Sequence, residues 1–81
     1  MILAVDIGNT NIVVGCIDGD RICFVERLST VSTRTELEYA ISFKNVLELY
    51  DIHFSRLEGG IISSVVPPVT NIVKRSVEKV L

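Results

Sequence analysis

The most chemically suggestive part of the chain places a carboxylate beside a small polar turn, in the segment Val5-Asp6-Ile7-Gly8-Asn9-Thr10-Asn11-Ile12-Val13. Asp6 interrupts an apolar run, where a buried carboxylate is costly unless it is paired, hydrogen-bonded or bound to a cation. The Gly-Asn-Thr-Asn turn is small enough for its backbone amides to face a bound anion. A carboxylate next to such a turn is the combination that a site for metal-bound nucleotide phosphates requires.

The same residues also have a purely structural interpretation. An Asp at the end of a strand often hydrogen-bonds to the turn that follows, and periodicity alone favours this reading of Asp6. Gly8 and its Asn neighbours are equally typical of a hairpin turn, because both residue types tolerate positive φ. The segment is not a Walker P-loop, since no Gly-Lys-Ser/Thr follows. These residues alone leave both interpretations open.

The other candidate residues carry weaker signals. His53, the only histidine, falls in a connector and is predicted to be a surface or turn residue. Ser63 and Ser64 lack a nucleophile elbow, so we expect them to hydrogen-bond at a strand end or to face a nucleotide cleft. Cys16 and Cys23 are predicted to be buried thiols without a disulfide. They would face each other if the intervening turn centres on residues 19–20, but not if it centres on 18–19.

The elements that must position these residues follow the order β-β-β-α-β-α. Tight turns at 8–10 and 18–20 predict a three-stranded meander, and a capping box near Thr35 and Glu38, or Thr33 and Glu36, starts a helix. The predicted strands are residues 1–7, 11–17, 21–28 and 59–66, and the predicted helices run from about 35 to Tyr50 and onward from Pro67. The fold class is therefore α/β, a mixed sheet with helices packed on its faces.

Apolar periodicity predicts which residues these elements bury. The first strand is apolar enough to be covered on both of its faces. In the first helix, one apolar stripe and a second beside it are visible: Leu37, Ala40, Ile41, Lys44 and Leu47, then Tyr39, Phe43, Val46 and Tyr50. The second helix has one apolar face made of Val69, Ile72, Val73, Ser76, Val77, Val80 and Leu81.

Size and composition exclude several classes of protein. The 81 residues fit one domain, and 48% hydrophobic residues with a mean hydropathy of +0.46 predict apolar surface covered by a partner or a further segment. A net charge of −2 and a pI near 5.2 argue against a nucleic-acid surface. Apolar runs of about five residues are too short to span a membrane, and no basic region precedes the first, so a cytoplasmic location is expected. The last residues still have a helical pattern, which predicts that the chain is a fragment.

Two motifs together resemble those of type III pantothenate kinases, which belong to the actin, Hsp70 and sugar-kinase superfamily. Residues 6–11, with a strand on each side, resemble the first phosphate motif of that family. Residues 60–68, Gly-Ile-Ile-Ser-Ser-Val-Val-Pro-Pro, resemble its Ile-Ser-Ser-Val-Val-Pro-Pro segment. The β-β-β-α-β-α order is also how the superfamily's ribonuclease H-like nucleotide-binding core begins. The resemblance spans essentially the whole chain.

The resemblance implies that residues 1–81 are the N-terminal nucleotide-binding subdomain of a longer two-domain kinase, inactive as this chain alone. It implies an ATP phosphate site from Asp6 to Val13, with Asp6 near Mg²⁺, and places the general base beyond Leu81, so no catalytic residue is assigned here. The implied enzyme is a cytoplasmic homodimer that phosphorylates pantothenate in the first step of coenzyme A synthesis and needs K⁺ or NH₄⁺. The alternative is a non-catalytic module or half-domain that needs a complementing chain. The implied site residues are Asp6, Ile7, Gly8, Asn9, Thr10, Asn11, Ile12 and Val13.

Overall fold

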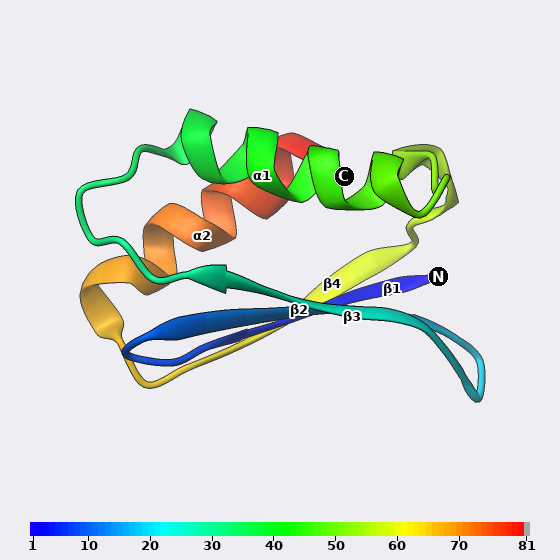
Figure 1. Ribbon diagram of the computed structural model, residues 1–81, viewed down its shortest axis with the longest axis horizontal. Coiled ribbons are helices and arrows are strands. Elements are labelled where there is room, and N and C mark those ends of the chain that lie inside the picture. Colours follow the sequence, from blue (N-terminus) through cyan, green and yellow to red (C-terminus); the bar gives the residue numbers. More distant parts are fainter. Residues whose placement is uncertain (81) are drawn as a thin grey trace.

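The computed structural model describes residues 1–80 as a four-stranded mixed sheet with two α-helices and one short 3₁₀ helix (Figure 1). The order of elements is the predicted β-β-β-α-β-α, which confirms the α/β fold class. The elements are β1 (Ile2–Ile7), β2 (Asn11–Asp18), β3 (Arg21–Ser29), α1 (Glu36–Leu49), η1 (Phe54–Arg56), β4 (Gly59–Ser64) and α2 (Pro67–Val80).

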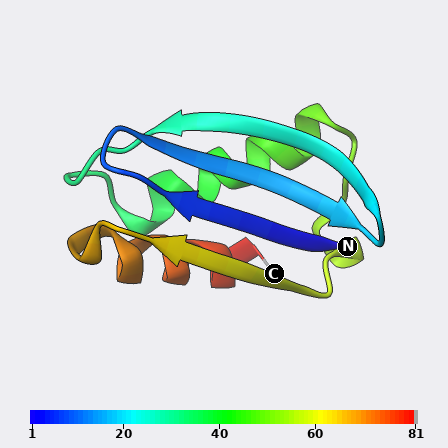
Figure 2. The ribbon, with the colours of Figure 1, turned by 90° about the horizontal axis from the view of Figure 1, so that it is seen from below.

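The strands lie in the order β3-β2-β1-β4 (Figure 2). The predicted meander is present, because β1 pairs antiparallel with β2 and β2 pairs antiparallel with β3. The chain then crosses through α1 to the other side of β1, where β4 pairs in parallel with it. Asp6 therefore lies on an inner strand, opposite Val13 of β2 and Ser63 of β4.

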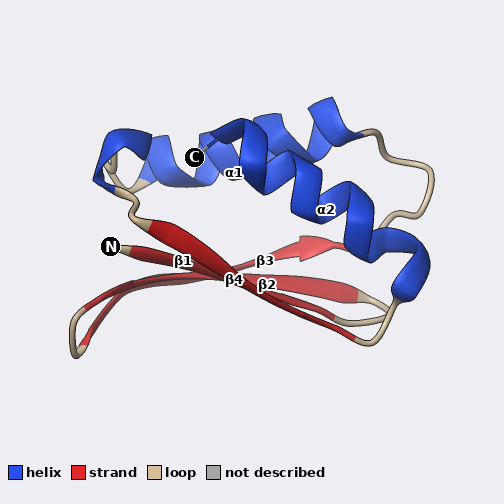
Figure 3. Cartoon of the chain, turned by 180° about the vertical axis from the view of Figure 1, so that it is seen from behind, coloured by secondary structure: helices blue, strands red, loops and turns tan. Residues whose placement is uncertain are grey.

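Both helices pack on one face of the sheet and, within residues 1–80, leave the other face open (Figure 3). The prediction that the first strand is covered on both faces is therefore wrong for the described residues. Alternate residues of β1 point to the helices and are buried, whereas Ile2, Ala4 and Asp6 point to the open face. The core comprises Leu3, Val5, Ile7, Ile12, Val14, Cys16, Phe24, Tyr39, Ala40, Phe43, Leu47, Ile52, Val69, Val73, Val77 and Val80.

Helix α1 buries only part of what its periodicity predicts. Tyr39, Ala40, Phe43 and Leu47 are buried, and the remaining members of the first predicted stripe, including Leu37 and Ile41, are exposed. The predicted stripes are adjacent on the helix, so periodicity does not show which one faces the sheet. In α2 the predicted face is buried as expected at four valines and at Ser76, and Leu81 lies outside the described residues.

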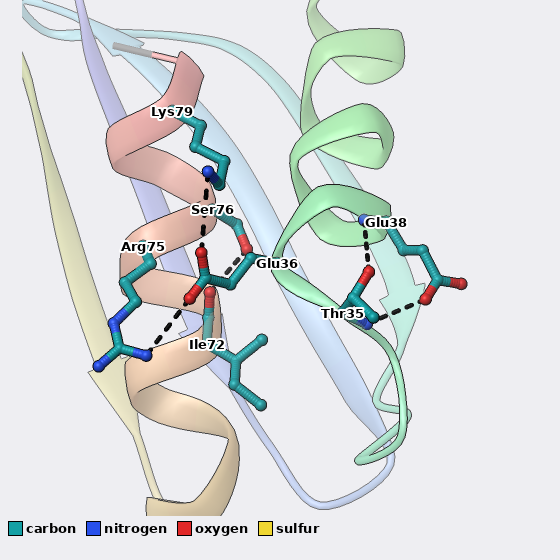
Figure 4. Close-up of polar contacts among 7 residues, drawn as sticks. All are labelled: Thr35, Glu36, Glu38, Ile72, Arg75, Ser76 and Lys79. Carbon is teal, nitrogen blue, oxygen red and sulfur yellow. Dashed lines mark hydrogen bonds and ion pairs between the residues drawn. The ribbon is translucent and has the colours of Figure 1, made fainter.

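The start of α1 is stabilised by its own cap and by charges on α2 (Figure 4). Thr35 is the N-cap, and its side chain and that of Glu38 complete the predicted capping box, with bonds of 3.2 and 3.0 Å. The carboxylate of Glu36, in the first turn, forms ion pairs with Arg75 Nη1 at 3.3 Å and with Lys79 Nζ at 3.8 Å. These contacts join the two helices at their solvent side.

The hairpin that carries the two cysteines contains a bulge. The turn centres on Gly19-Asp20, with Gly19 at a φ of +60°, but Cys16 pairs with Phe24 and Cys23 is the extra residue of β3. The bulge moves the two thiols out of direct register, and both are free, as predicted. Burial of Cys16, and next the neighbouring Cys23, raise the pKa of the Cys16 thiol above its usual 9.0.

Candidate functional site

The turn that joins β1 to β2 has three of its four carbonyl oxygens engaged in hydrogen bonds. The Gly8 amide donates to the Asn11 carbonyl at 2.9 Å. Thr30, which follows β3, donates its hydroxyl to the Gly8 carbonyl at 2.8 Å and its amide to the Thr10 carbonyl at 2.9 Å. Oxygens that would repel a bound anion are thus held by the protein itself.

The amides at the tip of this turn are available to a ligand. Within residues 1–80, no hydrogen bond engages the amides of Asn9 and Thr10. The side chains of Asn9, Thr10 and Asn11 are exposed, so the tip presents amide, hydroxyl and carboxamide donors together. This arrangement can bind an anion through neutral donors.

The limited room for a Cβ, and not the backbone conformation, favours glycine at position 8. Among residues 1–80, positive φ occurs only at Gly19 and Asp51, so the Gly8–Asn11 turn does not use the conformation that selects Gly and Asn in hairpins. A Cβ at Gly8 would instead lie 3.1 Å from the Asn11 carbonyl oxygen, which is closer than most real contacts. The close approach of Gly8 to Asn11 across the turn, and not a positive φ, is therefore the reason that a hairpin gives for this glycine.

Asp6 lies on the open face of the sheet, with its side chain exposed. The carboxylate is therefore hydrated in the described structure, and the expected cost of burying it does not arise there. It forms no ion pair within residues 1–80, and no hydrogen bond from the turn reaches it. The strand-end interpretation of Asp6 rested on such a bond, so its structural role is unsupported.

Arg27 and Thr30 lie near the site, and the sequence had not predicted either as part of it. Ser63 pairs with Asp6, Asp6 with Val13, and Val13 with Arg27, so one row across the open face contains a hydroxyl, a carboxylate and a guanidinium. The sequence around Arg27 and Thr30 carries no local motif that assigns either residue to the site. Only the strand register, which is set by pairing between distant segments, places them here.

The remaining predicted site residues form the base of the turn. Ile7 and Ile12 pair across β1 and β2 and are both fully buried, and Val13 is half-buried beside Asp6. Their side chains therefore hold the turn on the core instead of reaching a ligand. The structure thus brings Asp6 and the polar turn residues together at one end of the sheet (Figure 2).

The N-terminus of α2 lies at the same end of the sheet but offers no free amide at its start. Pro67 and Pro68 occupy the first two helical positions and have no N–H. The amides of Val69 and Thr70 both donate to the carbonyl of Val66, at 3.0 and 3.2 Å. Donors for an anion at this end therefore come from the Gly8–Asn11 turn.

A divalent cation fits this site only with help from its ligand. No group of three or more His, Cys, Asp or Glu side chains that could hold a metal ion occurs within residues 1–80, and Asp6 is the only acidic residue in residues 5–13. Mg²⁺ is commonly held by one or two carboxylates with waters and substrate phosphates, so one exposed aspartate beside a phosphate-binding turn suits it.

His53 takes no part, since its Nδ1 accepts the Ser55 amide at 3.2 Å and caps η1, as a turn residue does.

Within residues 1–80, neither α1 nor α2 is long and apolar enough to cross a membrane. The antiparallel meander, the crossover helix and the parallel fourth strand are the arrangement of the N-terminal half of the actin/Hsp70/sugar-kinase fold.

Comparison with known proteins then identifies the family. The family model for type III pantothenate kinase matches residues 2–81, so the chain belongs to the type III pantothenate kinase family. It is 48% identical over 69 residues to the type III pantothenate kinase of Exiguobacterium sp., covering 85% of this chain and 27% of that protein. It is 43% identical over 75 residues to those of Geobacter sulfurreducens and Geobacillus thermodenitrificans, covering 93% of this chain and 29% of each. The chain therefore spans less than a third of the length of these relatives.

Proposed function

We propose that this chain forms the ATP phosphate-binding part of a kinase that transfers the γ-phosphoryl group of ATP to the hydroxyl of pantothenate, the first step of coenzyme A biosynthesis. The observation that carries the proposal is the pair of unpartnered amides at Asn9 and Thr10, which lie two and three residues beyond the end of the strand that holds Asp6. Membership of the pantothenate kinase family supports the choice of reaction.

In this proposal the turn binds and orients the phosphates. The two free amides and the exposed Asn9 and Thr10 side chains donate to phosphate oxygens, while Thr30 keeps the Gly8 carbonyl away from them. Asp6 would hold Mg²⁺ directly or through its waters. When bound, Mg²⁺ neutralises charge on the phosphates and removes the repulsion between them and the Asp6 carboxylate. The chain contributes positioning, and we assign no general base within it.

We further propose that the full-length enzyme acts as a cytoplasmic homodimer and needs a monovalent cation, K⁺ or NH₄⁺. The family resemblance supports these proposals, and the apolar residues exposed on the open face of the sheet support the association of two copies.

The test of the proposal is a steady-state kinase assay on the full-length protein with ATP, Mg²⁺ and pantothenate. We expect Asp6→Asn to lower turnover at least about tenfold, because a preorganised electrostatic contact to reacting phosphates is worth several kcal/mol. Asp20→Asn is the matched control, since Asp20 is an exposed aspartate in the other hairpin turn. A loss of less than tenfold for Asp6→Asn, or an equal loss for Asp20→Asn, would contradict the phosphate-site role of Asp6.

A second candidate function is a folded module that binds nucleotide only with a complementing chain. The observation in its favour is the open sheet face, where Ile22, Val25 and Ile61 are 57–65% exposed. Titrating the 81-residue chain with MgATP while following the amides of residues 8–11 by NMR separates the two. Shifts at millimolar ATP show that the chain binds nucleotide alone and contradict the complemented module, whereas no shift leaves the 81-residue chain by itself only a structural fold.

A further inference from the structure

We infer that Thr30 is a positioning residue for the phosphate-binding turn: it sets the direction in which the Asn9 amide points. The inference deepens the proposed function and rests on it. Thr30 lies beyond the end of β3, about 20 residues along the chain from the turn, and its own side chain is half-buried. It is the only residue within the described part of the chain that donates to two carbonyls of the turn.

The two bonds of Thr30 act on different peptide units of the turn. Its hydroxyl donates to the Gly8 carbonyl at 2.8 Å, and its amide donates to the Thr10 carbonyl at 2.9 Å. Both distances are those of well-formed hydrogen bonds. The hydrogen bond from the Thr30 amide belongs to the main chain and survives substitution, whereas the hydrogen bond from the Thr30 hydroxyl depends on the side chain.

The hydroxyl bond orients an amide because the peptide unit is planar. The Gly8 carbonyl and the Asn9 N–H belong to one trans peptide, in which the oxygen and the hydrogen point in opposite directions. Holding the Gly8 oxygen at Thr30 therefore turns the Asn9 N–H away from β3. That N–H has no partner within residues 1–80, so it is left directed at a ligand.

The same contacts remove repulsion from the site. A phosphate oxygen is attracted to N–H groups and repelled by carbonyl oxygens, and without the Thr30 hydroxyl the Gly8–Asn9 peptide is freer to rotate. Rotation would exchange a donor for an acceptor at the tip of the turn. Preorganised donors stabilise a bound anion because no reorganisation is needed when it binds. Thr30 would thus improve phosphate binding without touching the phosphate.

The first experiment measures the direction of the Asn9 N–H without any nucleotide. Residual dipolar couplings are recorded on [¹⁵N]asparagine-labelled full-length protein as wild type, Thr30→Val and Thr30→Ser. Asn45 in α1 and Asn71 in α2 are internal references that lie in the helices. We expect Thr30→Val to change the Asn9 coupling while both references stay constant, and Thr30→Ser to restore it. An unchanged Asn9 coupling in Thr30→Val overturns the inference.

The second experiment measures the consequence for the nucleotide. We expect Thr30→Val to raise the KM for MgATP about three- to tenfold, the effect of losing one ordinary hydrogen bond, with a smaller change in kcat and with the KM for pantothenate unchanged. Thr30→Ser, which keeps the hydroxyl, should stay near wild type. A serine variant as impaired as the valine variant, or a loss in kcat alone, would show that Thr30 has only a structural role.

The two experiments keep the inference and the proposed function distinguishable. If the wild-type protein neither binds MgATP nor phosphorylates pantothenate, the proposed function is wrong, and the Asn9 coupling alone decides the role of Thr30. If the valine variant fails to fold, as judged by thermal melting, Thr30→Ala replaces it in both experiments with the same expected results.

Discussion

The hydroxyl of Tyr39 offers a sharp test of how the loop before α1 is held. Tyr39 is fully buried, and its hydroxyl donates to the Val31 carbonyl at 2.8 Å and accepts the Val31 amide at 3.0 Å. Tyr39→Phe keeps the ring in the core but leaves two partly buried backbone groups of Val31 without these partners. The Val31 carbonyl keeps the Arg34 amide, which donates to it at 3.1 Å, but the loop that follows Thr30 loses both of its bonds to the Tyr39 hydroxyl.

The magnitude follows from the two bonds. A typical hydrogen bond contributes about 0.5–1.5 kcal/mol net, so losing both should lower the free energy of unfolding by about 1–3 kcal/mol. For a domain of this size the total stability is roughly 4–12 kcal/mol, from about 0.05–0.15 kcal/mol per residue. The substitution should therefore remove a measurable part of it, and lower the melting temperature by several degrees.

Urea unfolding and amide hydrogen exchange measure the two sides of this prediction. The matched control is Tyr50→Phe, because Tyr50 is 39% exposed, bonds to the Glu26 carboxylate and stacks on Phe24, a stacking that phenylalanine keeps. We expect a smaller loss of stability for Tyr50→Phe, and faster exchange of the Val31 amide only in Tyr39→Phe. A Tyr39→Phe loss below about 0.5 kcal/mol, or an unchanged Val31 exchange rate, would refute the reasoning.

Two further predictions concern α1. Phe43→Ala should lower the free energy of unfolding in urea by about 3–5 kcal/mol because Phe43 is fully buried. Ile41→Ala, at a 48% exposed position, should lower it by less than about 1 kcal/mol. Equal losses for the two variants would mean that the helix packs through its other stripe. Hydrogen bonds from the Thr35 backbone, and next from its side chain, lower the pKa of Glu38 below its usual 4.5. A carboxyl with a lowered folded-state pKa adds stability above its unfolded-state pKa and loses that contribution as the pH falls through the folded-state value. Wild type should therefore lose more stability than Glu38→Gln between about pH 5 and about pH 3, and parallel pH profiles of the two proteins would contradict this.

Local signals predicted the parts of the structure that depend on neighbouring residues. The start of α2 at Pro67 lies where the sequence places it, the capping box at Thr35 and Glu38 is one of the two that the sequence offered, and the second hairpin turn lies within the predicted residues 18–20. Each depends on contacts within a few residues, which a sequence pattern encodes directly.

Features that depend on distant pairing were predicted less well. The sequence left open whether Cys16 and Cys23 face each other, and a bulge in β3 decided it. Periodicity showed two adjacent stripes on α1, and packing on the sheet buried two residues of each, Ala40 and Leu47 of the first and Tyr39 and Phe43 of the second. Within residues 1–80 only one face of the first strand is covered and not both as predicted, because the apolar run of β1 does not show on which side the two helices lie.

For the candidate site, the sequence by itself determined the residue types and their local order: an aspartate at the end of an apolar strand, then a small polar turn of residues 8–11. Only the tertiary structure decided that Asp6 is exposed on an open face and that Thr30 holds the turn. The physical reason is that these properties arise where β3 and β4 come beside the first hairpin. Chain segments far apart in sequence meet there, and no local pattern records their contact.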